Sequence, residues 1–582
     1  MSEHDPRDLV VIALSGVQRY ITESRTTVDA ANASDIMARL AAEAADQLEK
    51  DGAELVIPSK VDPTTAPNRI VALTAKNQGG ILARQAADKA RSHWRAWIAK
   101  LFGEVRDVPG FPEIMWSVAP VEIGSYADQW KAAQVTLAAR KRLRAFDYPE
   151  RKGTRPCSVS PYWPSEKSAP KNTPKHDQNS KLSAAVWLKR RWHATNKLPS
   201  TRSTGFPSTA SIASGPFRAR VLDSWDDSEV HDLVTKLSEA AREIMGPDLF
   251  WTLEGAVPSL DQAGQDSLKR WFIRRAGWWV TPDTWNVDAL SHEYGTPSEP
   301  VDPTTVQRGR DAAKQLAKVV DAAPNPYYAV LSADLDGLGR HLSASPITAE
   351  RHQRISQRLG DLSRTHHHRI QKNHAGVSVY SGGDDLLAFL PASTALEAAQ
   401  ACREAVDEDP TTLSCSVLFS HQGTPLHTVI ARSRALLAEA KKVPNKNAIA
   451  VGYITGSGAR AHTVRPWRSD WVSDALGALR TFKPRQGSSL TAAEDGGLSP
   501  RLINDLYSER AALSDLATRT AHRRIYKAYE AEVTRLVLRH GGNEQQARSL
   551  LDLGRSEHAE TTDAPVPLAA SRVAVFLRRQ TW

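Results

Sequence analysis

Residues 377–390 read Val-Ser-Val-Tyr-Ser-Gly-Gly-Asp-Asp-Leu-Leu-Ala-Phe-Leu, and this stretch decides the fold. Two apolar runs typical of β-strands flank a turn that carries Gly382, Gly383, Asp384 and Asp385. Glycine permits a tight turn and lets backbone N–H groups approach a phosphate, and adjacent carboxylates supply the oxygen ligands that Mg²⁺ prefers. Gly-Gly-Asp is also ordinary hairpin chemistry, because turns favour Asp for local hydrogen bonds. The elements around the hairpin must therefore decide between a plain turn and a metal site.

An alternation of strands and helices surrounds the hairpin. An apolar run at 327–334 predicts a strand that ends at Asp334, and Thr348 is the expected N-cap of the next helix. This βαββαβ order predicts an α+β fold with a ferredoxin-like sheet, in which the first strand lies beside the hairpin. Asp334 would then approach Asp384 and Asp385 in space. The other expected elements are helices at 348–372, 393–407 and 425–442 and strands at 412–419 and 447–454.

Three carboxylates from two distant segments predict a nucleotidyl-transfer centre. Such a cluster repels itself unless cations neutralise it, so Asp334, Asp384 and Asp385 are expected to hold one or two Mg²⁺ (or Mn²⁺) ions. Lys441 offers a positive charge to a triphosphate, but its position also fits a solvated lysine near a helix C-terminus. The groups expected to bind or border the nucleotide are Gly337, Gly339, Ser381, Gly382, Gly383 and Lys441.

The chain resembles the large polymerase/cyclase-like subunit of type III CRISPR effector complexes, closest to the III-B branch. Other cyclases of the GGDEF type share the acidic hairpin, so the resemblance depends on several blocks that occur together in family order. The blocks are Leu14-Ser-Gly-Val-Gln-Arg-Tyr-Ile-Thr-Glu-Ser-Arg25, Ser34-Asp-Ile-Met37, Glu54-Leu-Val-Ile-Pro58, Pro67-Asn-Arg-Ile70, Gly205-Phe-Pro-Ser-Thr-Ala-Ser-Ile-Ala213, Tyr328-Ala-Val-Leu-Ser-Ala-Asp334, Tyr380-Ser-Gly-Gly-Asp-Asp-Leu386 and Ser414-Cys-Ser-Val-Leu-Phe-Ser-His421.

This resemblance implies two palm (nucleotidyl cyclase) domains that face each other, with helical insertions and a C-terminal helical domain. It also implies synthesis of cyclic oligoadenylates from ATP when guide RNA pairs with target RNA. Residues 1–105 would form the first, non-catalytic palm domain, and 106–320 a mixed helical and loop region that partly completes it. Residues 321–458 would form the catalytic palm domain. After Gly458 the chain is expected to turn helical, with helices at 474–481, 499–516 and 520–539, and 459–582 would pack beside small helical subunits of the complex.

Two departures from the family pattern limit these implications. Many members carry an N-terminal HD nuclease domain, but the first expected strand begins at Leu9, which leaves no room for it. Many also hold a four-cysteine zinc module, whereas this chain has only Cys157, Cys402 and Cys415, without a Cys-x-x-Cys pair. We therefore expect neither DNA cleavage by this chain nor bound zinc.

The composition agrees with a large nucleoprotein subunit. A chain of 582 residues is longer than one core usually supports, so several domains are expected. Its 75 Lys and Arg against 66 Asp and Glu give a net charge of +9, which favours polyanionic partners such as RNA. The low cysteine content, the polar leader and the short apolar runs favour a cytoplasmic protein outside the membrane.

Two other functions stay open on the sequence. One is a catalytically silent scaffold that binds guide RNA and partner subunits. Its sequence could carry the same three aspartates, because the loss of a single contact elsewhere could disable synthesis. A stand-alone cyclic nucleotide synthase is the third possibility, and the N-terminal domain and the helical tail make it the least consistent of the three.

Overall fold

The computed structural model of the protein covers most of the chain. The residues that it describes are 7–143, 155–174, 177–193, 205–247, 254–261, 266–295, 300–382, 384–406, 411–467, 475–482, 497–518, 523–554 and 568–580.

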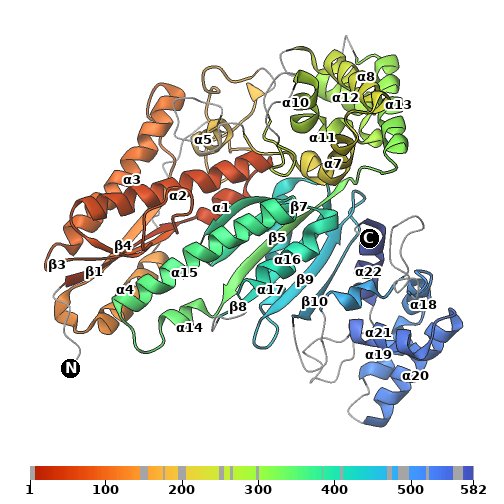
Figure 1. Ribbon diagram of the computed structural model, residues 1–582. Coiled ribbons are helices and arrows are strands. Elements are labelled where there is room, and N and C mark those ends of the chain that lie inside the picture. The colour runs from red at the N-terminus through yellow and green to blue at the C-terminus, as the bar shows by residue number, and fades with distance from the viewer. Residues whose placement is uncertain are drawn as a thin grey trace.

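The N-terminal part forms a four-stranded antiparallel sheet, followed at the end of its first strand by the short helix α1 (Val17–Thr22) (Figure 1). Helices α2 (Thr27–Lys50) and α3 (Gly79–Phe102) pack on one face, and α4 (Tyr126–Arg142) packs on the other. The strands lie in the order β2-β3-β1-β4, which is the ferredoxin-like arrangement. Their bounds are β1 (Arg7–Ser15), β2 (Glu54–Ile57), β3 (Arg69–Ala75) and β4 (Glu113–Ala119).

A second, six-stranded sheet contains the acidic hairpin. Its order is β10-β9-β8-β5-β7-β6, in which the last four strands repeat the ferredoxin-like arrangement and β9 lies parallel to β8. The strands are β5 (Tyr327–Asp336), β6 (Val377–Gly382), β7 (Asp385–Pro391), β8 (Thr412–His421), β9 (Ala448–Ile454) and β10 (Arg460–Pro466). Its helices are α14 (Leu338–Leu342), α15 (Ala349–His368), η4 (Arg369–Asn373), η5 (Ala392–Thr394), α16 (Ala395–Glu404) and α17 (Leu426–Ala440).

The expected elements around the hairpin are confirmed, with ends that shift by a few residues. Thr348 caps α15, because its side chain accepts a hydrogen bond from the Arg351 N–H. The expectation that 459–582 is helical is wrong at its start. Residues Arg460–Pro466 instead form β10, which pairs antiparallel with β9 and extends the sheet. The run lacks a regular apolar alternation, and the neighbouring strand supplies the pairing that local sequence does not reveal.

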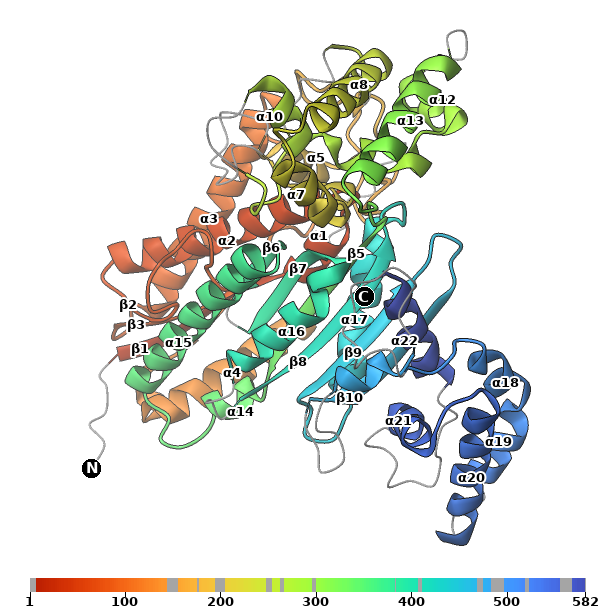
Figure 2. The same cartoon turned by 45° about the vertical axis from the view of Figure 1, so that its right-hand side comes forward.

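Strand β5 lies between two hydrophobic cores, because alternate side chains of a strand point to opposite faces. Tyr328 and Val330 face a core that α17 and the helices of the first sheet share. Ala329 and Leu331 face a second core, built with α16 and the C-terminal helices. Both sheets therefore contribute to one continuous core, which fixes their relative positions. Figures 1 and 2 show α15 running between the two sheets, where it contacts both β2 and β6.

The remaining helices form two further groups (Figure 2). One group lies above the second sheet in this view and has its own core. The other group packs against β9 and β10 and shares the core that contains α16. No described helix combines the length and apolar character needed to cross a membrane. The first group and the preceding α5 comprise α5 (Ala184–Arg191), α6 (Thr209–Ala213), α7 (Gly215–Asp223), α8 (Ser228–Met245), α10 (Ser267–Arg274), α11 (Ala276–Trp279), α12 (Val287–Tyr294) and α13 (Pro303–Val319). The C-terminal group comprises η6 (Gly477–Arg480), α18 (Leu502–Ser508), α19 (Arg510–Thr518), α20 (Arg523–Arg539), α21 (Glu544–Gly554) and α22 (Leu568–Gln580).

Truncation of Phe389 tests the shared core. Its side chain is fully buried, and its ring lies 6.4 Å from that of Phe206 and 6.2 Å from that of Tyr328. Phe389→Ala should lower the free energy of unfolding by about 3–5 kcal/mol. Urea unfolding measures the change, and Gln400→Ala on the exposed side of α16 should cost less than about 0.5 kcal/mol. A loss for Phe389→Ala as small as that of the control would contradict the shared core.

Candidate functional site

The pairing of β5 with β7 assembles the centre of the site. Asp334 lies directly opposite Asp385 in the antiparallel register, and the Leu335 N–H donates to the Asp384 carbonyl oxygen at 2.9 Å. The carboxyl groups of Asp334 and Asp385 share a hydrogen bond. Two residues that are remote in sequence are therefore in contact, and Asp384 follows in the turn. Gly383 of the same turn lies outside the described residues.

Burial and mutual repulsion make these carboxyl groups weak acids. Burial, together with the nearby Asp385, raises the pKa of Asp334 to about 6, although Lys441 opposes the shift. Asp384 is exposed at the turn, and partial desolvation together with Asp334 raises its pKa, whereas the pKa of Asp385 is raised by burial and by Asp384. The site therefore holds more negative charge than its surroundings neutralise, which is the condition that favours a bound cation.

Basic and amide groups from other elements reach the carboxylates. Lys441 directly follows α17 and forms an ion pair with Asp334. Gln18 of α1 donates from Nε2 to Oδ2 of Asp385 at 3.0 Å. Arg69, the first residue of β3, interacts electrostatically with Asp384. Two of the three neighbours, Gln18 and Arg69, thus come from the four-stranded sheet and its helices, which form the first domain.

Asp336 has a structural role instead. It is 4% exposed, and its Oδ2 accepts hydrogen bonds from Thr412 Oγ1 at 3.1 Å, Ser414 Oγ at 2.7 Å and the Asn447 N–H at 3.1 Å. These contacts fix the loop between α17 and β9, which carries Lys441 at its start. The second aspartate of the strand therefore supports the site without belonging to it.

A cavity of about 850 Å³ opens between the two sheets beside Asp384. Leu338, Gly339 and Asp384 line it from the second sheet, and Asn68, Arg69 and Lys141 line it from the first domain. Burial lowers the pKa of Arg69. Lys141 is exposed, and partial desolvation together with Arg69 lowers its pKa. Two neighbouring cations in a cavity of this size can bind the phosphates of a nucleotide.

The other glycines and Ser381 predicted from sequence take varied positions. Gly339 lines the cavity, and Gly337 adopts φ of +78° at the N-cap of α14. Gly382 pairs with Asp385 within the hairpin. Ser381 is engaged by Ser363, to whose carbonyl oxygen its hydroxyl donates at 3.2 Å. Their roles as nucleotide contacts stay predictions.

Sequence reasoning assigned no role to Gln18, Arg69 or Lys141. Gln18 and Arg69 lie in two of the sequence blocks that carry the family resemblance. The blocks by themselves do not indicate that these side chains reach the carboxylates. Lys141 lies in a basic run on α4 that also fits a solvated helix face. Only the packing of the first domain against the second reveals that all three point to one site.

The donor set fits a hard divalent cation, although it is not assembled as a complete metal site. Paired carboxylates with raised pKa values supply oxygen ligands and excess negative charge. Within the described part of the chain, however, no three His, Cys, Asp or Glu side chains are placed so that they could hold a metal ion together. Asp384 therefore stands beside the Asp334–Asp385 pair and does not complete it.

Comparison with known proteins supports the family. Residues 327–450 match the model of the second palm domain of Cas10/Cmr2. The CRISPR system Cmr subunit Cmr2 of Pyrococcus furiosus is 27% identical over 238 residues, which cover 34% of this chain and only 26% of that protein.

Solved structures agree on the fold. A chain of the type III-B Cmr-beta complex in the apo state has a TM-score of 0.54 at 13% identity, covering 92% of this chain and 77% of that chain. A chain of Cmr-beta bound to cognate target RNA has a TM-score of 0.57 at 13% identity, with coverages of 92% and 78%.

Fold and site together define a palm-domain protein with a carboxylate pair beside an interdomain cavity. Residues 327–450, which include the acidic hairpin, belong to the Cas10/Cmr2 palm domain family, and the chain is similar to Cmr2 over 238 residues.

The raised pKa of Asp334 predicts a pH dependence of stability in metal-free protein. The folded state retains the Asp334 proton up to pH of about 6, whereas the unfolded chain releases it near 3.8. The stabilisation that this proton provides is complete below pH 3.8 and is lost as pH rises through 6. Asp334→Asn should remove this loss, which is on the order of 3 kcal/mol. Urea unfolding in EDTA at pH 4 and pH 7.5 should show the variant gaining on wild type as pH rises, and parallel profiles would contradict the assignment.

Proposed function

We propose that the chain is the large subunit of a type III CRISPR effector complex and makes cyclic oligoadenylates from ATP in a Mg²⁺- or Mn²⁺-dependent reaction. The contact between Asp334 and Asp385 beside the interdomain cavity carries this proposal. Guide RNA, target RNA and the other subunits of the complex are the proposed partners. Support for them comes from the fold shared with a Cmr-beta chain whose complex binds cognate target RNA.

The cavity supplies the proposed ATP site. Arg69 and Lys141 would bind phosphate oxygens from the side of the first domain, and Gly339 would border the nucleotide from α14. The cavity is within the size range of small-molecule sites in proteins. Because both domains line it, neither domain alone would hold the substrate.

The reaction would join a ribose hydroxyl of one ATP to the α-phosphate of another, with pyrophosphate leaving. Asp334 and Asp385 would hold the divalent ion with Asp384 beside them, and this ion supplies charge neutralisation at the α-phosphate and activation of the hydroxyl. Lys441 lies next to Asp334, where a positive charge stabilises an anionic phosphate. The protein's contribution is to orient both nucleotides, and a bound divalent ion would in turn favour the ionised form of the carboxylates.

A catalytically silent scaffold is the second candidate. The observation that favours it is that, among the residues that the structure describes, no third carboxylate joins Asp334 and Asp385 as a metal ligand. In addition, the ion pair between Lys441 and Asp334 already satisfies part of the negative charge. The two functions differ in whether any adenylate product forms.

Removal of the carboxylates separates enzyme from scaffold. The purified complex, incubated with Mg²⁺, ATP and matched target RNA, should form adenylate products that chromatography resolves. Asp384→Ala/Asp385→Ala should abolish them, and so should Asp334→Ala alone, while assembly of the complex persists. Glu397→Ala, which removes an exposed carboxylate on α16, should leave synthesis unchanged. Absence of product from the wild-type complex under any metal or target condition would favour the scaffold. Activity of the isolated chain without RNA would instead favour a stand-alone synthase.

Substitution of the cavity cations tests the nucleotide site. Arg69→Ala and Lys141→Ala should each weaken binding of a non-hydrolysable ATP analogue roughly 10-fold or more, because each removes a charge-assisted hydrogen bond. Isothermal titration calorimetry of the full chain measures the affinity. Lys131→Ala, an exposed lysine on the same helix as Lys141, is the matched control. Equal affinities for all three variants and wild type would place the nucleotide elsewhere.

A further inference from the structure

Helix α1 of the first domain is docked onto the carboxylate pair of the second. Besides the Gln18 Nε2 contact with Asp385, the Gln18 carbonyl oxygen accepts a hydrogen bond from Arg434 Nη1 on α17 at 2.8 Å. Arg434 also reaches the hydroxyl of Tyr380 in β6, at 3.4 Å from Nη2. One residue of α1 is thus held on both its side chain and its backbone by the domain that carries the acidic hairpin.

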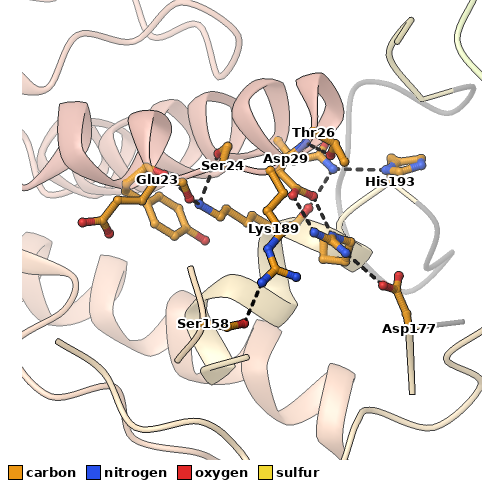
Figure 3. A network of polar contacts seen from close by, with 12 residues as sticks. Glu23, Ser24, Thr26, Asp29, Ser158, Asp177, Lys189 and His193 are labelled. Atoms are coloured by element: carbon orange, nitrogen blue, oxygen red, sulfur yellow. Dashed lines mark hydrogen bonds and ion pairs between the residues drawn. The ribbon is translucent and has the colours of Figure 1, made fainter. Parts of the chain in front are cut away.

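The other end of α1 is held by a buried lysine (Figure 3). Lys189 of α5 is fully buried, and its Nζ donates to the carbonyl oxygens of Tyr20, at 2.9 Å, and Glu23. It also reaches Ser24 Oγ at 3.2 Å and lies 4.8 Å from the centre of the Tyr20 ring. Carbonyl groups at a helix C-terminus lack partners within the helix and carry partial negative charge, so a cation there stabilises the helix end.

Helix α5 itself is anchored on α2. Arg190 contacts both oxygens of Asp29 at 2.9 Å each, and Asn32 Nδ2 donates to the Lys189 carbonyl oxygen at 2.8 Å. Figure 3 shows Asp29, Asp177 and Lys189 within this one network. The α2–α5 unit therefore forms a rigid base for α1.

Burial of the charged Lys189 side chain is costly. Burial lowers its pKa to about 8, with Asp29 opposing the shift, and the Nζ contacts named above all lie at the end of α1. A charged side chain is retained in an interior position only where it is well hydrogen-bonded. The contacts of Lys189 therefore indicate that its role is to hold α1 in place.

We propose that Gln18 is a positioning residue for Asp385, and that Lys189 sets the position of Gln18 by holding the C-terminal end of α1. The inference rests on the proposed function in so far as Asp385 binds a metal ion. The Gln18 amide fixes the orientation of the Asp385 carboxylate, as hydrogen-bond donors behind metal ligands do. Any displacement of α5 on α2 is transmitted to Asp385 through the six residues of α1.

Binding of Mn²⁺ to the full chain, followed by electron paramagnetic resonance, tests the proposal without a need for turnover. Gln18→Leu and Lys189→Met should each weaken Mn²⁺ binding roughly 10-fold. Because both act through the same contact, the double variant should be no weaker than the weaker single variant. Lys181→Met, an exposed lysine that precedes α5, is the matched control and should bind as wild type does.

The outcomes separate the proposal from its premise. If wild type binds Mn²⁺, Asp384→Ala/Asp385→Ala abolishes binding and Gln18→Leu binds normally, the positioning role is overturned and the metal site stands. If Lys189→Met lowers the unfolding temperature but not the Mn²⁺ affinity, or if the two losses add, Lys189 does not act through Gln18. If wild type binds no Mn²⁺, both the metal site and the positioning role fail.

A milder variant covers the case in which Lys189→Met does not fold. The Tyr20 hydroxyl donates to the Ala185 carbonyl oxygen at 2.7 Å and joins α1 to α5 directly. Tyr20→Phe removes only this bond and should weaken Mn²⁺ binding in the same direction but less. An unchanged affinity would count against the link between α5 and the site.

Discussion

Antiparallel pairing of β5 with β7 brings the carboxylates of Asp334 and Asp385 together, where burial leaves them poorly solvated. The polar contacts around the site offset part of the free-energy cost of this desolvation. Lys441 pairs with Asp334, Gln18 donates to Asp385, and Arg69 lies in the field of Asp384. A shift of one residue in the register would turn these side chains to the opposite face of the sheet. The strand pairing is in turn held by apolar side chains on both faces of β5.

The site belongs to two domains, although only one carries the acidic residues. The first sheet and its helices supply an amide, two cations and half of the cavity wall. The continuous core between the sheets explains how these groups keep their positions. A domain without carboxylates of its own can thus still be needed for chemistry, because it orients and neutralises groups that the other domain provides.

Much of the second domain follows from local pattern. The strand that ends at Asp334, the cap at Thr348 and the hairpin each have a local signal in turn residues or apolar alternation, and the strand order follows from βαββαβ connectivity. Strand β10 has no such signal, because its side chains are only partly buried and its pairing with β9 is a tertiary contact. Of the site, the carboxylates could be proposed from the sequence, because the βαββαβ order places the strand that carries Asp334 beside the acidic hairpin. The contacts of Gln18, Arg69 and Lys141 could not, because they depend on how the first sheet packs against the second and not on the residues next to them in the chain.

The sequence by itself determined the acidic residues and most elements of the second sheet with their order, because these depend on local propensity and on the period of the apolar pattern. Only the tertiary structure decided that Asp334 contacts Asp385 while Asp384 stands apart, that Asp336 supports a loop, and that Lys189 is buried behind α1. Those facts depend on distances between side chains from segments far apart in the chain. Such distances are set by the packing of the two sheets against each other, and no local sequence pattern predicts that packing.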